Sequence, residues 1–222
     1  MEISENNDSL KIYKANNLVY YTQKEEIVNA ATHFVGMLLG LASFGILAYA
    51  KSVSSIISCI ICCLGLTIPY AVSTIYHGTK NVYRKSVWRK VDHSGVCFII
   101  LACGAPLCLN MSIHIFDYIA LALSIAICFA NIIMCVCNFN KLARVALILD
   151  FVCAALMIVV FFVNRTSVPK MSKIFYLVAS IFCAAGAIFY GRKKIYLHTI
   201  FHLLMLVATT LYFVGAIIII LQ

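Results

Sequence analysis

The stretch VSSIISCIICCLGLTIPYAVSTIY, residues 53–76, decides the fold class because no charged side chain interrupts it. A helix of about 20 apolar residues is long enough to cross the hydrocarbon core of a bilayer. The rest of the chain has the same character, since 64% of its 222 residues are hydrophobic and only 11% are charged. The sequence therefore predicts an integral membrane protein, in the plasma membrane or an internal membrane.

Apolar stretches of this kind recur along the chain and are separated by polar breaks at 51–52, 78–90, 110–114, 138–141, 164–173 and 192–194. They predict transmembrane helices at about 27–50, 53–76, 91–111, 114–137, 142–163, 172–191 and 195–221. Strand-like alternation is absent, which argues against a membrane barrel. We expect an all-α, seven-transmembrane helix bundle.

The first 25 residues are polar and mixed in charge, and they lack the apolar core of a cleavable signal peptide. We expect them to form a polar cytoplasmic N-terminal segment. Residues 26–222 then form a single membrane domain, because a chain of this length leaves no room for a second one.

The positive charge is distributed unevenly between the two sides of the predicted bundle. Of the 17 Lys and Arg residues, 13 lie on the side of the N-terminus and four on the other side. The positive-inside rule places the N-terminus in the cytoplasm and Gln222 outside. The formal net charge of +9 favours membrane lipids with anionic headgroups as partners, and no nucleic-acid-binding module is recognisable.

The 11 cysteines do not indicate disulfides or a thiolate metal site. Ten fall within predicted spans, and Cys108 lies near the outer end of one. No pair occupies an outer loop where oxidation could join it. We expect free cysteines that pack as small apolar side chains.

Five polar residues stand out because ionisable groups beside membrane segments are costly. Ser73 and His77 end the second predicted span. Asp92 opens the third, and His198 and His202 begin the seventh. All five therefore lie at the same cytoplasmic depth, on three different helices.

The helical spacing of these residues suits a metal. Residues four apart share one helix face, as in Ser73-x-x-x-His77 and His198-x-x-x-His202. Two imidazoles from one helix and one from a neighbour fill three corners of a tetrahedron and leave the fourth free for water, which is typical of catalytic zinc. Zinc suits imidazole ligands, whereas calcium or magnesium would need more oxygen ligands.

Each feature also has a simpler interpretation. A His-x-x-x-His pair arises by chance at helix ends, and Ser73 could bond to a carbonyl oxygen one turn back. Asp92 could pair with Arg89 or Lys90, or cap the third helix. Their coincidence at one depth favours a site.

The other histidines have weaker signals. His33 follows Glu26 and Asn29 on one face of the first span, where the three could line the site or form interhelical hydrogen bonds. His93 points about 100° away from Asp92, and His114 lies in a predicted outer loop.

Five motifs also carry a family resemblance: Glu26-Ile27-x-Asn29-x-x-Thr32-His33, Ser73-x-x-x-His77, Asp92-His93-Ser94-Gly95, Gly186-Ala187-Ile188-Phe189-Tyr190 and His198-x-x-x-His202. In this order, from about Glu26 to Phe213, they resemble the hemolysin III-like branch of the progestin and adipoQ receptor family.

The resemblance implies a seven-helix bundle with a cytoplasmic N-terminus and zinc held by His77, His198 and His202. Ser73 and Asp92 would stand beside the metal. Two positions depart from the family pattern: Thr199 stands where Glu is frequent, and Tyr212 stands close to where many members have another histidine. Neither is one of the three ligand positions.

Three functions are compatible with this site. The first is a zinc-dependent hydrolase of lipid amides or esters, with a ceramide-like substrate suggested by the wider family, in which Asp92 transfers protons and Ser73 orients water or stabilises the oxyanion. The second is a receptor or membrane regulator whose zinc pins the second and seventh helices together. The third, which the motifs support least, is a cytolytic pore.

Overall fold

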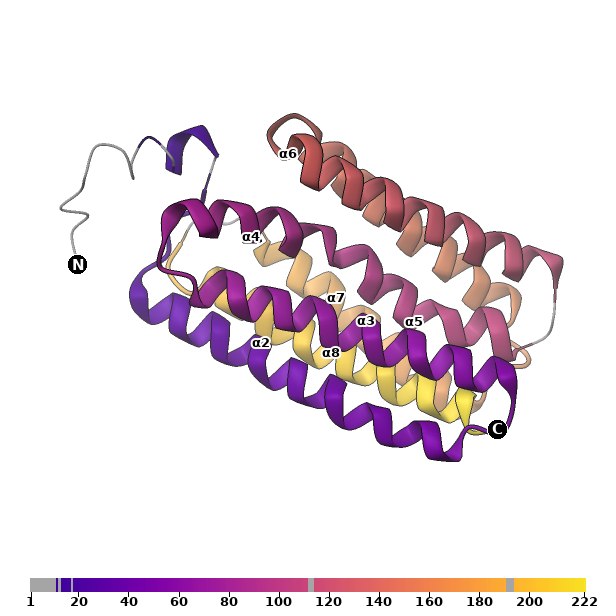
Figure 1. The fold of residues 1–222 in the computed structure, drawn as a ribbon. Coiled ribbons are helices and arrows are strands. Elements are labelled where there is room, and N and C mark those ends of the chain that lie inside the picture. The colour runs from indigo at the N-terminus through magenta and orange to yellow at the C-terminus, as the bar shows by residue number, and fades with distance from the viewer. Residues whose placement is uncertain (1–10, 12, 17, 112–113, 191–193) are drawn as a thin grey trace.

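The computed structural model describes residues 11, 13–16, 18–111, 114–190 and 194–222, which form a bundle of long helices with no strand among them (Figure 1). The helical elements are α2 (Gln23–Ser43), η1 (Phe44–Tyr49), α3 (Val53–Gly78), α4 (Val82–Ser94), α5 (Val96–Asn110), α6 (Ile115–Val163), α7 (Lys170–Phe189) and α8 (Leu197–Ile220). In the described chain, six helical segments are long and apolar enough to cross a membrane. The prediction of an all-helical, multi-pass membrane bundle is confirmed.

Helix α6 supplies two of the predicted spans. It covers 49 residues, but Asn138 inside it has non-helical backbone angles (φ −150°, ψ 61°). At 1.5 Å per residue a straight helix of this length would far exceed the bilayer core. Asn131 instead donates to Asp150 at 2.8 Å, and Asn164 donates to Asp117 at 2.9 Å. Both pairs are centred beside Asn140, so the chain turns back there and the two limbs run antiparallel (Figure 1).

The predicted basic loop at 78–90 is wrong in one respect, because most of it is helix α4. The side chain of Asn81 caps this helix by accepting from the amide of Arg84 at 3.0 Å. Asp92 therefore lies in the last turn of α4 rather than in the first turn of a helix that it caps. Helix α5 continues from Gly95 with only a slight break, so the third span begins earlier than the sequence indicates.

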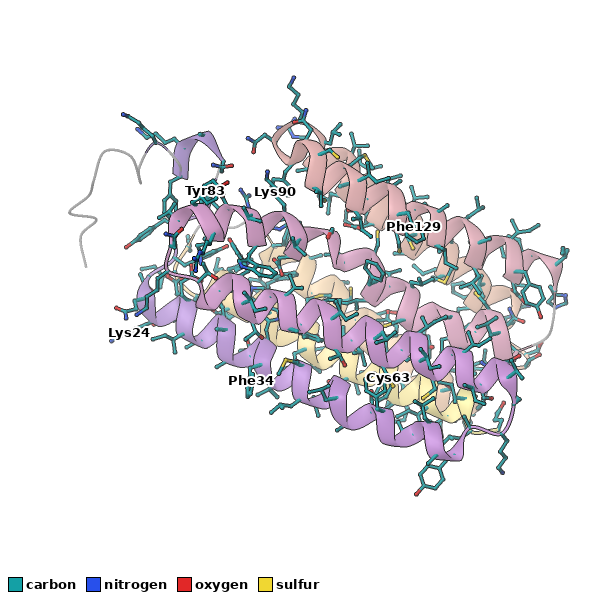
Figure 2. All side chains as sticks on the ribbon, viewed as in Figure 1. Lys24, Phe34, Cys63, Tyr83, Lys90 and Phe129 are labelled. Atoms are coloured by element: carbon teal, nitrogen blue, oxygen red, sulfur yellow. The ribbon has the colours of Figure 1, made fainter. Side chains whose placement is uncertain are left out.

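Many large apolar side chains face outward, as expected for a protein surrounded by lipid. Phe34 on α2 and Phe129 on α6 are 46% and 62% exposed, and they project from the bundle in Figure 2. Polar side chains are buried instead: Asn131 and Asp150 interact with Cys97 across α5 and both limbs of α6. All 11 cysteines are free, in agreement with the sequence prediction.

Close approach of α2 to α3 determines where the site forms. Gly36 and Gly40 lie one turn apart on α2, a spacing that lets membrane helices pack closely. A Cβ atom at Gly40 would lie 2.6 Å from the Thr67 hydroxyl oxygen and 2.8 Å from the Thr67 backbone nitrogen. The missing side chains therefore bring the two helices together directly beside His33, which lies one turn before Gly36.

Candidate metal centre

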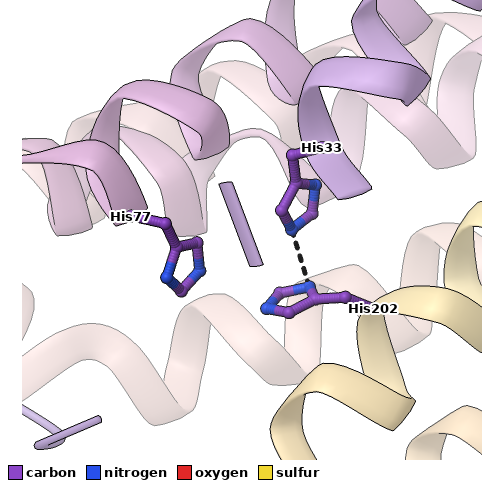
Figure 3. A group of neighbouring side chains, drawn as sticks. All are labelled: His33, His77 and His202. Atoms are coloured by element: carbon purple, nitrogen blue, oxygen red, sulfur yellow. Dashed lines mark hydrogen bonds between the residues drawn. The ribbon is translucent and has the colours of Figure 1, made fainter. Parts of the chain in front are cut away.

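Three histidines from three helices form a buried cluster. His33 lies on α2, His77 on the last turn of α3 and His202 on the second turn of α8. Each offers a ring nitrogen, and these nitrogens all lie within 4.8 Å of one another, so the group could hold a metal ion. Figure 3 shows the three rings facing a common space, with a hydrogen bond joining His33 to His202.

The cluster has unused hydrogen-bonding capacity. Among the described residues, His33 Nδ1, His77 Nε2 and His202 Nε2 are buried and have no hydrogen-bond partner. A buried polar atom without a partner costs about 1–3 kcal/mol. Buried imidazole nitrogens without a partner are donors that a metal ion such as zinc accepts.

The hydrogen bond inside the cluster restricts which rings can act as ligands together. His33 Nε2 lies 2.7 Å from His202 Nδ1. A neutral imidazole has one N–H group and one lone pair. While this bond is kept, one of the two outward nitrogens, His33 Nδ1 and His202 Nε2, carries a proton and the other carries the lone pair. The pair therefore supplies one ligand atom at a time, and a three-imidazole site needs a further ring.

The structure does not place His198, which was predicted to be a ligand, within this group of three, but the ring of His198 lies beside the group. Its centroid lies 4.2 Å from that of His202 and 5.8 Å from that of His77. On its other side it stacks on Tyr21, with centroids 4.8 Å apart and an interplanar angle of 20°. Burial raises the pKa of the Tyr21 hydroxyl above its usual value. A residue from the predicted polar N-terminal segment thus covers the side of the cluster that the charge distribution assigns to the cytoplasm.

Glu26 and Lys85 hold His77 from outside the cluster. The Oε2 atom of Glu26 lies 2.7 Å from His77 Nδ1, and its Oε1 atom lies 2.9 Å from Lys85 Nζ. Lys85 also donates to the carbonyl oxygen of Tyr76 at 3.0 Å and lies over the ring of that residue, 4.6 Å from its centroid. Lys85 is only 3% exposed, which is unusual for a lysine.

Ser73 and Asp92 form a pair one helical turn from His77. The hydroxyl of Ser73 lies close to the carboxyl group of Asp92. Thr74, the next residue on α3, donates to the carbonyl oxygen of Tyr70 at 2.8 Å, within its own helix. Ser73 on α3 and Asp92 on α4 are therefore neighbours.

The two positions that depart from the family pattern have partners of their own. Thr199 donates to Asn29 Oδ1 at 2.7 Å, and the Tyr212 hydroxyl lies 2.7 Å from the Ser180 hydroxyl. Neither side chain belongs to the histidine cluster.

The start of α8 is held by α2. Tyr196 precedes the helix with a φ of 62°, in the left-handed region that costs a bulky residue about 1–2 kcal/mol. Its backbone amide donates to Glu25 Oε1 at 2.8 Å, while the Oε2 atom of Glu25 accepts from Thr22 in a capping box. The first turn of α8, which carries His198, is thereby anchored to α2.

The two remaining histidines, His93 and His114, lie outside the cluster. His93 packs edge-on against Phe139 with centroids 5.0 Å apart, and His114 precedes α6, where its backbone amide approaches Asp117. Lys85 carries no signal in the sequence, because it stands in a basic stretch that resembles an ordinary cytoplasmic loop. The spacing of Glu26 and His33 did indicate a shared face. Arg192 and Lys193, counted for the topology, lie outside the described residues.

The sequence is similar to known proteins over most of its length. The sequence model of the family described as haemolysin-III related matches residues 21–213. A curated protein, "Hemolysin-3 homolog" from Bacillus subtilis (strain 168), is 25% identical over 187 residues, which are 82% of this chain and 88% of that protein. The matched region contains every residue of the cluster and its neighbours.

Proposed function

Because this chain belongs to the haemolysin-III-related family, we propose that its histidine cluster binds zinc and that the protein hydrolyses lipid amides or esters. The observation that carries the proposal is the pair of buried Nε2 atoms, on His77 and His202, that have no hydrogen-bond partner among the described residues. Nitrogen donors of this kind, without a surrounding set of carboxylates, suit zinc better than calcium or magnesium.

The proposed ligands are His77, His198 and His202. This set is compatible with the hydrogen bond between His33 and His202. His202 donates its Nδ1–H to His33 Nε2, and its Nε2 lone pair is free for the metal. His77 uses Nε2, because Glu26 occupies its Nδ1 side.

If His77, His198 and His202 hold zinc, the metal would supply a Lewis acid that polarises a carbonyl group and lowers the pKa of water to about 7. Asp92 accepts a proton from the water that attacks the carbonyl carbon. As the carbon–nitrogen or carbon–oxygen bond breaks, Asp92 returns the proton to the leaving amine or alcohol. Ser73, whose hydroxyl lies close to the Asp92 carboxyl group, holds that group in place for both transfers.

The proposed substrates are membrane lipids of the ceramide class or related esters. The cluster lies at the basic end of the bundle, which the charge distribution assigns to the cytoplasmic face, where lipid amide and ester carbonyls meet the headgroup layer. A lipid amide needs both a polarised carbonyl and a protonated leaving amine, and the histidine cluster and Asp92 provide those two functions.

Metal analysis of the purified protein, followed by lipid hydrolysis assays, tests the proposal. We expect about one zinc per chain, and we expect replacement of both His198 and His202 to abolish zinc binding and hydrolysis together. Full zinc occupancy in that double variant would refute the ligand assignment.

A regulator with a structural zinc is the second candidate, and the number of helices that meet at the cluster favours it. A metal held by His77 and His202 would join α3 to α8 in the way that structural zinc joins separate segments. In that case Asp92 has no chemical task.

A further inference from the structure

One face of α2 reaches both sides of the histidine cluster. Glu26, Asn29 and His33 follow one another at helical spacing on this face. Glu26 contacts His77 on α3, and His33 contacts His202 on α8, while Asn29 lies between them and accepts from Thr199 on α8. We propose that Glu26 and His33 are positioning residues that turn the Nε2 atoms of His77 and His202 toward the metal, and that Lys85 fixes Glu26.

This inference rests on the proposed metal site but not on the reaction proposed there. It assigns tasks to Glu26, His33 and Lys85, none of which is among the proposed ligands. A metal-binding histidine whose other ring nitrogen is held by a carboxylate or another acceptor has a defined tautomer and a more basic ligand atom.

The contact of Glu26 determines the tautomer of His77. Glu26 is paired with the ammonium of Lys85, so it is a carboxylate and can only accept. His77 Nδ1, at 2.7 Å from it, must therefore carry the proton. The Nε2 atom of His77 is left with its lone pair, and it is one of the nitrogens that have no partner among the described residues.

Lys85 is built into this arrangement. Its ammonium group is buried against three features: the Glu26 carboxylate, the carbonyl oxygen of Tyr76 and the ring face of Tyr76. Burying an ammonium group is costly unless it is paired in this way. Lys85 and Asp92 are also two turns apart on α4, so a single helix holds Glu26 at one point and Ser73 at another.

His33 performs the corresponding task for His202. When His202 donates its Nδ1–H to His33 Nε2, the Nε2 atom of His202 keeps its lone pair. His77 and His202 therefore both present Nε2, because residues of α2 hold the Nδ1 atoms of both rings.

A purely structural role for these residues makes a different prediction. The ion pair of Glu26 and Lys85 also ties α2 to α4, so its loss could lower stability without any specific effect on the metal. Zinc affinity and the spectrum of bound cobalt separate the two roles, because both report the ligand atoms directly.

The experiment uses the full-length protein in lipid nanodiscs and measures the dissociation constant for zinc by competition with a chelator. We expect Glu26→Leu and His33→Leu each to raise this constant about 10–100-fold and to shift the visible absorption of the cobalt-loaded protein. Glu26→Gln and His33→Gln keep an acceptor oxygen and should recover most of the lost affinity. Lys85→Met alone should weaken zinc binding. In a double variant that already carries Glu26→Leu, Lys85→Met should cause no further loss of affinity.

Asp117→Leu is the matched control. Asp117 is a buried carboxylate on α6 that pairs with Asn164, at the other end of the bundle, so its loss lowers stability without touching the cluster. Zinc affinity in this variant should equal that of the wild type. An equal loss of affinity in Asp117→Leu and Glu26→Leu would overturn the proposal.

Three further results would also overturn it. Wild-type zinc affinity and an unshifted cobalt spectrum in Glu26→Leu would show that Glu26 does not position His77. Zinc affinity in Glu26→Gln as low as in Glu26→Leu would show that an acceptor oxygen at this position is not what matters. Complete loss of zinc in His33→Leu, as in His77→Leu, would make His33 a ligand. Absence of zinc from the wild type would instead refute the proposed function itself, whereas zinc binding without hydrolysis would leave the positioning roles intact.

Discussion

The Nε2 atom of His33 lies 2.7 Å from the Nδ1 atom of His202, so a hydrogen bond joins α2 to α8 within the histidine cluster. This bond separates two possible ligand sets, because two neutral rings that share it cannot both direct a lone pair outward. One set includes His33 as a ligand, and the other includes His198.

Removal of single histidines distinguishes the two sets. We expect His198→Leu to lose stoichiometric zinc, and we expect His33→Leu to keep about one zinc per chain with weaker affinity. Metal analysis after extensive dialysis measures both. The reverse pattern would assign the third position to His33 and would require the His33–His202 bond to break on metal binding.

The Asp92→Asn variant separates catalysis from a structural metal. The amide has nearly the size and shape of the carboxyl group, but it cannot take up a proton, so hydrolysis of a labelled ceramide-like lipid should fall about 10²–10⁴-fold. Zinc content should remain at the wild-type value. Unchanged turnover would remove Asp92 from the mechanism, and an unchanged cellular effect in a protein without hydrolytic activity would favour the regulator.

Chelation should lower the stability of the folded protein. A ligand present at about 1,000 times its dissociation constant stabilises the native state by about 4 kcal/mol. The melting temperature of the wild type in detergent should therefore fall when zinc is removed and recover when zinc is restored. The His77→Leu variant should melt at the same temperature with and without a chelator, and a chelator-dependent shift in it would place the zinc elsewhere.

Gly40→Ala should separate α2 from α3. The added methyl group would lie 2.8 Å from the Thr67 backbone nitrogen, which cannot move away as a flexible side chain could. We expect a loss of about 1–3 kcal/mol in thermal or denaturant unfolding, with weaker zinc binding because His33 moves with α2. Gly45→Ala is the control, since a Cβ atom there meets nothing within 4 Å. Equal stability of the two variants would contradict the close packing.

Asn131→Leu should loosen the hairpin of α6 and leave the metal site intact. The variant loses the bonds from Nδ2 to Asp150 at 2.8 Å and to the carbonyl oxygen of Ala146 at 3.1 Å. Interhelical hydrogen bonds in membranes contribute on average about 0.6 kcal/mol each, so we expect a loss of about 1–2 kcal/mol in unfolding free energy. Zinc content should not change. Ile133→Leu, on the exposed side of the same limb, should have no effect on either quantity.

Much of the fold is predictable because membrane insertion depends on local properties. Apolar runs of sufficient length give helices, and the predicted spans 53–76 and 195–221 overlap α3 and α8 almost completely. Helix α4 was missed because its residues are polar, and a polar stretch beside a membrane span resembles a loop. The break at Asn138 fell within a predicted polar connection, although the helix on either side is nearly continuous.

Hydrophobicity and charge also predict the depth of the candidate site along the bundle. Spacing and charge place Ser73, His77 and Asp92 near one another, and the hydroxyl of Ser73 does lie close to the carboxyl group of Asp92. The partners within the cluster were not predictable. His33 and His202 are 169 positions apart in the chain, and no periodicity relates them.

Hydrophobicity and the positions of charges were therefore sufficient to establish a helical membrane bundle with histidines near its basic end. They act on each segment separately, so they set the segment's length, depth and orientation. The approach of α2 to α3 and α8 decided the rest: His33 bonds to His202, Glu26 holds His77, and Lys85 is buried beside Glu26. Those contacts depend on how far each helix is rotated and how closely it packs, and neither quantity can be read from the hydrophobicity or charge of a single segment.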